Sequence, residues 1–182
     1  MRPAKVFAIS DTHFGHVNIL KFEQKFRPFS TIEEHNEELV KRWNSVVSPQ
    51  DTVWHLGDAV FGMFNLNYIR RLNGHKRLVM GNHDRFDTQA YLNNGFERLY
   101  GAVSVERKLN GQRVKCILTH IPVSEHQFHR YHFNVHGHLH HNVLEDQRYI
   151  NVSCEQINLT PVELDSLLVH RKLGTLKDEE NE

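Results

Sequence analysis

Five short groups of polar residues, each closing an apolar run, contain the residue types that bind metal ions. In chain order they are Asp11-Thr12-His13, Gly57-Asp58, Gly81-Asn82-His83-Asp84, Thr119-His120 and Gly137-His138-Leu139-His140. Imidazole, carboxylate and amide-oxygen ligands suit Mn²⁺, Fe²⁺, Zn²⁺ or Ni²⁺ better than soft metals, which prefer thiolates. Each group alone is a common pattern, but five of them in one chain indicate a metal centre.

The order of these groups resembles the motifs of the calcineurin-like metallophosphoesterase superfamily, which read D-x-H, G-D, G-N-H-D, H and G-H-x-H. All five motifs are intact, and the resemblance covers about residues 6–140. The stretches DTHFGH-x-NI, RPF and NVSCE are similar to a compact bacterial and phage subgroup of predicted phosphohydrolases. The resemblance implies an α/β fold, a four-layer αββα sandwich of two mixed sheets flanked by helices, with a dinuclear metal centre between the sheets.

The resemblance also implies a role for each polar residue of the motifs. Asp11, His13 and His140 would hold the first cation, Asn82, His120 and His138 the second, and Asp58 would bridge the two. His83 would be the catalytic histidine, and Asp84 would be its orienting partner. The cofactor would be two divalent metal ions, with Mn²⁺ expected first and Fe, Ni or Zn as alternatives.

The residue types also indicate how a phosphate ester would be cleaved. A carboxylate such as Asp58 can give one oxygen to each of two cations and hold them about 3.5–4 Å apart. Such cations lower the pKa of bound water from 15.7 toward about 7, so a bridging hydroxide is available at neutral pH. His83 is not needed as a ligand and can protonate the leaving oxygen. The sequence shows no Ser or Cys paired with a base, so we expect hydrolysis without a covalent intermediate.

An anionic substrate needs further polar side chains to orient it. Arginine is favoured for this purpose because its planar guanidinium binds phosphate through two hydrogen bonds. We expect three residues to contact the substrate, namely His16 shortly after Asp11 and His13, Arg27 in the RPF stretch, and Arg85 beside the G-N-H-D motif. Arg130 is a further candidate.

Several histidines outside the motifs are expected to be structural or to lie on the surface. Those at 126, 129 and 132 have three-residue spacing, but a polar helix or turn surface explains them better than another metal site. His141 should point away from His140 if the preceding strand continues through both residues.

The motifs require elements that bring distant strand ends together. Apolar runs predict strands at 6–9, 53–56 and 77–80, with helices at 31–47 (capped by Ser30 or Thr31), 65–72 and 88–94. The second half predicts strands at 99–109, 113–119, 133–135 and 149–152, a hairpin turn at Asn110-Gly111, and a closing helix at 161–169 capped by Thr160. This order favours two packed sheets with helices outside, and ligand sites gather where such strands end.

The whole chain has the size and charge of one globular domain. Its 182 residues carry equal numbers of acidic and basic side chains, and we expect one domain at 1–176 with a charged, frayed tail at 177–182. Neutrality argues against a broad electrostatic surface for nucleic acid, so a small phosphorylated substrate or a short nucleic-acid end is expected.

Cys116 and Cys154 are isolated in apolar runs, as reduced core thiols would be. The chain lacks a signal-peptide layout and any apolar run of about 20 residues, so we expect a soluble, cytoplasmic protein with no membrane association and no obligatory protein partner.

The predicted function is metal-dependent hydrolysis of a phosphate ester, with phosphodiesters as the first choice. A phosphomonoesterase or a nucleotide pyrophosphohydrolase is the alternative, since one fold supports all three reactions. A non-catalytic metal-binding scaffold is a rival of another class. Such a scaffold would be expected to lose ligands or the catalytic histidine, whereas this sequence retains all of them.

Overall fold

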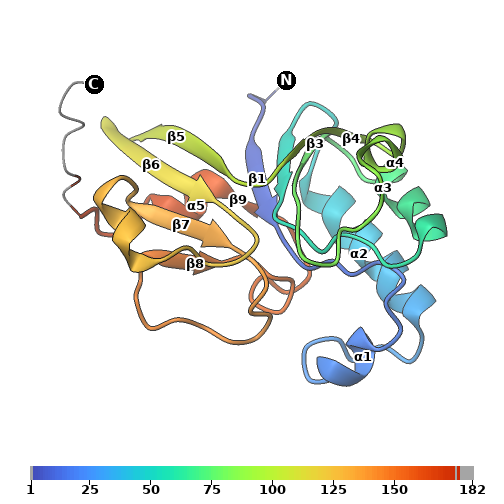
Figure 1. Cartoon of the computed structure of the whole chain (residues 1–182). Coiled ribbons are helices and arrows are strands. Elements are labelled where there is room, and N and C mark those ends of the chain that lie inside the picture. The colour runs from blue at the N-terminus through green and yellow to red at the C-terminus, as the bar shows by residue number, and fades with distance from the viewer. Residues whose placement is uncertain (1, 175, 177–182) are drawn as a thin grey trace.

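Two mixed β-sheets lie face to face at the centre of the protein (Figure 1). The computed structural model describes residues 2–174 and 176, so the predicted tail at 177–182 lies outside the described residues. The first sheet has the strand order β4-β3-β2-β1-β9 and the second has the order β5-β6-β7-β8. Two mixed sheets with flanking helices confirm the predicted α/β fold class.

The first sheet is built mainly from parallel strands. Its members are β1 (Val6–Ile9), β2 (Thr52–His55), β3 (His75–Val79), β4 (Phe96–Tyr100) and the short β9 (Val162–Glu163). The strands from β1 to β4 pair in parallel, and β9 pairs antiparallel with β1. Because parallel strands share one direction, the segments that follow β1, β2 and β3 emerge at the same edge of the sheet.

Helices cover the outer face of the first sheet (Figure 1). They are α2 (Ile32–Val46), the 3₁₀ helix η1 (Met63–Leu66), α3 (Asn67–Arg70) and α4 (Thr88–Asn93), with the single turn α1 (Ile19–Phe22) lying beyond them. Thr31 caps α2 through a capping box with Glu34, as predicted for one of the two candidate caps. Leu39 and Trp43 of α2 join the core on this face of the sheet.

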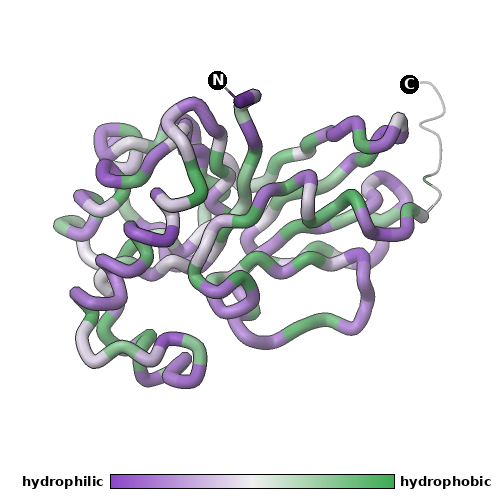
Figure 2. Tube along the Cα trace, turned by 180° about the vertical axis from the view of Figure 1, so that it is seen from behind, coloured by the Kyte–Doolittle hydropathy of each residue, from purple (hydrophilic) through white to green (hydrophobic). Residues whose placement is uncertain are grey.

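The second sheet contributes the other wall of the core between the sheets. It consists of β5 (Val103–Leu109), β6 (Gln112–Leu118), β7 (Phe133–His136) and β8 (Tyr149–Asn151). Val114, Cys116 and Leu118 alternate along β6 and pack in one cluster with Trp54 and Leu56 of the first sheet. Figure 2 shows hydrophobic residues running along the strands and hydrophilic residues gathering in the loops.

Two details of the second sheet agree with the sequence. Asn110 and Gly111 join β5 to β6 with φ values of 49° and 80°, the left-handed conformation that a two-residue hairpin turn requires. Cys116 and Cys154 are free and buried, and burial raises the pKa of the Cys116 thiol to about 12.

The outer face of this sheet is covered by the 3₁₀ helix η2 (Glu125–His129), in which Phe128 meets Tyr149 with ring centroids 4.9 Å apart. His126 and His129 lie in η2, and His132 directly precedes β7.

Three predicted elements differ in the structure. The run at 99–109 is not one strand, because the chain leaves the first sheet after β4 and enters the second sheet at β5. The closing helix predicted at 161–169 is shorter, because Val162–Glu163 pairs with β1 and α5 (Leu164–Leu168) begins only afterwards, so Thr160 is not its cap. The helix predicted at 65–72 begins earlier, as η1, and continues as α3.

No helix in the described part of the chain has the length and apolar content needed to cross a membrane.

Candidate metal centre

The five polar motifs meet at the edge where strands of both sheets end. Asp11 follows β1, Asp58 follows β2 and Asn82 follows β3, whereas His120 and His138 follow β6 and β7 of the second sheet. Hydrogen bonds join the two sets across the sheets. The backbone N–H of His138 donates to Asp11 Oδ2 at 2.9 Å, and His120 Nδ1 lies 2.8 Å from the carbonyl oxygen of Leu56.

The first cluster of possible ligands is Asp11, His13 and His140, whose ligand atoms all lie within 4.8 Å of one another. Asp11 Oδ2 is held by the His138 amide and by Ser153 Oγ, each at 2.9 Å. Asp11 Oδ1 and both ring nitrogens of His13 are buried and have no hydrogen-bond partner within residues 2–174 and 176. Buried polar atoms are rarely left in this state, so the donor set fits a cation at this position.

The second cluster surrounds Nε2 of His120. This nitrogen lies 2.9 Å from Asn82 Oδ1, 3.2 Å from His138 Nδ1 and 3.5 Å from Asp58 Oδ2. Ligand atoms about 2.0–2.2 Å from one ion lie roughly 3–3.4 Å from each other, so these separations suit a shared cation. Because Nδ1 of His120 is occupied by the Leu56 carbonyl, Nε2 is the nitrogen left for a metal.

Asp58 lies between the two clusters. Its Oδ2 is 3.5 Å from His120 Nε2 and 3.7 Å from His13 Nε2, so one carboxylate oxygen faces ligands of both predicted cations. Its Oδ1 accepts the backbone N–H of His83 at 2.8 Å, which fixes the carboxylate. The position of Asp58 is the one a bridging ligand needs.

The backbone at the motifs is unusual. In the described part of the chain, eight residues other than glycine have positive φ, and five of them are predicted ligands, namely Asp11, His13, Asp58, His138 and His140, with φ from 50° to 70°. This left-handed conformation costs roughly 1–2 kcal/mol for an ordinary residue and clusters at functional sites. The motif glycines serve close packing of the same loops, since a Cβ on Gly137 would lie 1.9 Å from Ser10 Oγ.

Buried contacts depress the pKa of the Asp11 carboxyl. Burial alone would raise this pKa, but the charges of the nearby histidines His13, His140 and His120 outweigh it and hold the pKa well below its usual range. The Asp11 carboxyl is therefore ionised at neutral pH.

Comparison with known proteins decides the family. The model of the calcineurin-like phosphoesterase superfamily domain matches residues 4–160. This chain belongs to the calcineurin-like phosphoesterase superfamily.

Proteins similar to this phosphoesterase come from several sources. An uncharacterized protein of Methanocaldococcus jannaschii is 35% identical over 179 residues, which cover 92% of each chain. The Gene 66 protein of Mycobacterium phage L5 is 40% identical over 80 residues, or 41% of this chain and 37% of the phage protein. The crystal structure of a protein of unknown function from Aquifex aeolicus has a TM-score of 0.69 at 27% identity and covers 88% of this chain and 95% of that chain. The likeness thus extends well beyond the motifs.

His83 and Asp84, the catalytic pair predicted for this phosphoesterase, have different contacts in the structure. His83 is exposed, with its ring centroid 5.9 Å from that of His13, so it lies beside the first cluster. Asp84 instead accepts the backbone N–H groups of Asp58 at 2.7 Å, Ala59 at 3.0 Å and Gly81 at 2.8 Å. The Asp84 carboxylate thus fastens the two ligand loops together, and no hydrogen bond joins it to His83 within the described residues.

The three predicted substrate contacts of the phosphoesterase have different surroundings. His16 stacks on Phe61 with ring centroids 3.9 Å apart and lies 5.3 Å from His13, so it forms a wall of the site. Burial, together with the charge of His13, lowers the pKa of His16 to about 4, which leaves its ring neutral. Arg85 is exposed beside the site and donates to the carbonyl oxygen of Asn82 at 3.0 Å.

Arg27 is fully buried, so the prediction that it contacts substrate is wrong. Its guanidinium donates to the carbonyl oxygens of Asp11 at 2.6 Å and Thr12 at 3.1 Å, and to Glu155 Oε1 at 2.7 Å. An exposed phosphate cannot displace these contacts without opening the core. Arg27 therefore stabilises the backbone of the first motif from the buried side.

Glu155, Glu23 and His141 are polar neighbours of the site that sequence reasoning missed. Glu23, Glu155 and His140 form a third group of possible ligands within 4.8 Å. The strand before His140 ends at His136, so the condition under which His141 would point away from His140 is not met, and His141 Nδ1 lies 2.8 Å from Glu23 Oε2. Glu155 had a visible signal, because it is the acidic residue that ends the NVSCE stretch after the last apolar strand.

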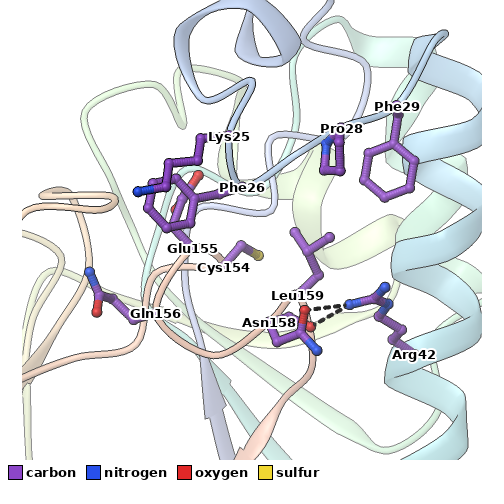
Figure 3. Close-up of a pocket in the computed structure, with 10 residues that line it drawn as sticks. All are labelled: Lys25, Phe26, Pro28, Phe29, Arg42, Cys154, Glu155, Gln156, Asn158 and Leu159. Carbon is purple, nitrogen blue, oxygen red and sulfur yellow. Dashed lines mark hydrogen bonds between the residues drawn. The ribbon is translucent and has the colours of Figure 1, made fainter.

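Two cavities adjoin these groups. One of about 390 Å³ opens beside the second cluster and is lined by Met80, Asn82, Gly101, His120 and Ile121, among others. Another of about 430 Å³ lies next to Glu155, between Phe26, Phe29 and Leu159 (Figure 3). Only the first has predicted ligands in its wall.

Proposed function

We propose that this phosphoesterase hydrolyses a phosphodiester with the help of two divalent cations, Mn²⁺ being the expected metal. Asp11, His13 and His140 would hold one cation, Asn82, His120 and His138 the other, and Asp58 would bridge them. The observation that carries this proposal is the convergence of these side chains from five strand ends, with buried ligand atoms that lack a hydrogen-bond partner among the described residues. The substrate would be a small phosphorylated compound or a short nucleic-acid end.

The side chains around the two cations would have different roles in the reaction. When bound, the two cations would supply Lewis acidity for the phosphate oxygens and activate water at neutral pH. His83 lies at the open side of the site and would hold a proton for the leaving oxygen. The His16–Phe61 stack would shield this side from water, and Arg85 would meet a phosphate oxygen that extends toward solvent.

The cavity of about 390 Å³ beside Asn82 and His120 favours a diester over a monoester. A diester carries a second organic group, and this cavity gives that group a place next to the proposed second cation. A monoester would leave the cavity to water. The phosphate would then sit between the cavity and His83.

The test is metal restoration after chelation. The stripped protein would be assayed with bis-p-nitrophenyl phosphate and with p-nitrophenyl phosphate, while Mn²⁺, Ni²⁺, Zn²⁺ or Mg²⁺ is restored singly. We expect Mn²⁺ to restore hydrolysis and the diester to be preferred. A preference for the monoester would make the protein a phosphomonoesterase, and two bound cations without turnover of these esters or of nucleotides would support a scaffold.

A further inference from the structure

A buried chain of hydrogen bonds runs from Arg27 through Glu155 to His140. Glu155 Oε1 lies 2.7 Å from Arg27 Nε and 3.1 Å from His140 Nδ1. The side chains of Arg27 and Glu155 are both fully buried. The carboxylate therefore contacts a predicted metal ligand while its charge is balanced by the guanidinium.

This contact determines which nitrogen of His140 is free. A carboxylate accepts hydrogen bonds, so His140 Nδ1 carries the proton and Nε2 keeps its lone pair. Nε2 is the nitrogen that faces Asp11 Oδ1, at 3.8 Å, in the first cluster. Glu155 thus selects the tautomer that can bind a cation there.

Arg27 extends the same support to the other two ligands of the first cluster. Its guanidinium donates hydrogen bonds to the carbonyl oxygens of Asp11 and Thr12, the two residues before His13. These bonds hold the turn in which Asp11 and His13 have left-handed backbone conformations. One guanidinium therefore connects the turn that carries Asp11 and His13 with the carboxylate that orients His140.

We propose that Glu155 is a positioning residue for the first cation, acting through His140, and that Arg27 joins it to the Asp11–His13 turn. This inference rests on the proposed function only in taking His140 as a cation ligand. Carboxylates placed behind a ligating histidine raise its basicity, and their loss typically weakens metal binding about 10–100-fold.

A third cation between Glu23, His140 and Glu155 is the competing interpretation of these contacts. Two features oppose it. His140 Nδ1 points its proton at Glu155, and Arg27 already neutralises that carboxylate. Glu23 has a partner of its own in His141.

The experiment is a titration of the chelated full-length protein with Mn²⁺ in competition with a chelator. Glu155→Gln removes the charge and keeps the shape of the side chain. Glu163→Gln makes the same change on β9, where the carboxylate pairs with Lys5, and is the matched control. We expect two cations per chain in the wild type, with one of the two bound about 10–100-fold more weakly in Glu155→Gln and neither altered in Glu163→Gln.

Two results would overturn the inference. One is a Glu155→Gln protein that binds both cations with unchanged affinity. The other is three cations in the wild type, with one lost in both Glu155→Gln and Glu23→Gln, which would establish the third site instead. A wild type that binds no cation would instead refute the proposed function.

A second measurement requires no variant, in case Glu155→Gln fails to fold around the buried Arg27. Long-range ¹H–¹⁵N correlation spectra of the wild type report which ring nitrogen of His140 carries the proton. We expect the proton on Nδ1 before and after Mg²⁺ is added. A proton on Nε2 in the cation-free protein would rule out the assigned role of Glu155.

Discussion

His83 is the residue whose proposed role separates chemistry from metal binding. Its side chain is exposed and lies beside the cluster of predicted ligands without belonging to it. We expect His83→Ala to lower kcat about 10²–10⁴-fold, the usual effect of losing a general acid, while both cations remain bound. Metal analysis of the purified variant alongside its kinetics checks this. Loss of a cation in His83→Ala would contradict the assignment.

Asp58 should behave in the opposite way, because one of its oxygens faces both clusters. Asp58→Ala should release both cations and reduce kcat/KM by at least about 10³-fold, since several kcal/mol of transition-state stabilisation depend on them. Equilibrium dialysis with Mn²⁺ measures the first effect. Retention of two cations would show that Asp58 is not shared.

The convergence of the motif residues was predictable at the residue scale, but their supporting contacts were not. Spacing and position after strands identified the residues that converge. The sequence could not show that Arg27 is buried, because its burial depends on the backbone carbonyls of Asp11 and Thr12, which only the fold brings next to the guanidinium. The backbone partners of Asp84 were not visible for the same reason, since they are three amides on two separate loops.

At the scale of elements, Asp51 ties the N-terminal segment to the start of β2. Its carboxylate accepts hydrogen bonds from Arg2 at 2.9 Å and from the backbone N–H groups of Lys5 and Ser48 at 2.8 Å each. Burial tends to raise its pKa, but these contacts outweigh burial and lower the pKa of Asp51 to about 2. The ionised carboxylate therefore stabilises the fold above the unfolded pKa of about 3.9.

Asp51→Asn should accordingly lower the free energy of unfolding by about 1–3 kcal/mol at pH 7. Because the folded pKa lies below the unfolded one, the stabilisation is lost as pH falls from about 4 to about 2, and the difference between the two proteins should narrow there. Urea unfolding of both proteins across this range is the measurement. A difference that stays constant with pH would show that the charge of Asp51 contributes little.

Element types were largely predictable, whereas their partners were not. The helix α2 and the Asn110-Gly111 turn depend on local signals, and both were predicted. The change of sheet between β4 and β5 and the pairing of β9 with β1 depend on distant strands, which periodicity does not identify. The motifs could still be placed, because each immediately follows a strand.

For the whole molecule, the proposed centre would add a connection between two sheets that hydrogen bonds such as His138 N–H to Asp11 Oδ2 already join at this edge. A cation that binds only the folded state stabilises it by RT ln(1 + [L]/Kd), about 2.7 kcal/mol when the free ion is at 100 times Kd. Chelation should therefore lower Tm, and added Mn²⁺ should restore it in proportion to the logarithm of its concentration. Scanning calorimetry measures this, with Asp58→Ala as the variant expected not to respond. A Tm independent of Mn²⁺ in the wild type would count against the centre.

The left-handed backbone at five of the predicted ligands means that the cation-free fold is locally frustrated. Relieving one such position should strengthen the fold and weaken the site together. His138→Gly keeps the amide that donates to Asp11 and removes a Cβ at φ 70°. Once the entropy cost of glycine is subtracted, His138→Gly should raise the free energy of unfolding by about 0.5–1 kcal/mol in the presence of chelator. Urea unfolding measures this change. A lower free energy of unfolding would mean that this turn is unstrained. Selection for stability alone would favour glycine at such positions, so keeping histidine and aspartate there holds the protein below its attainable stability.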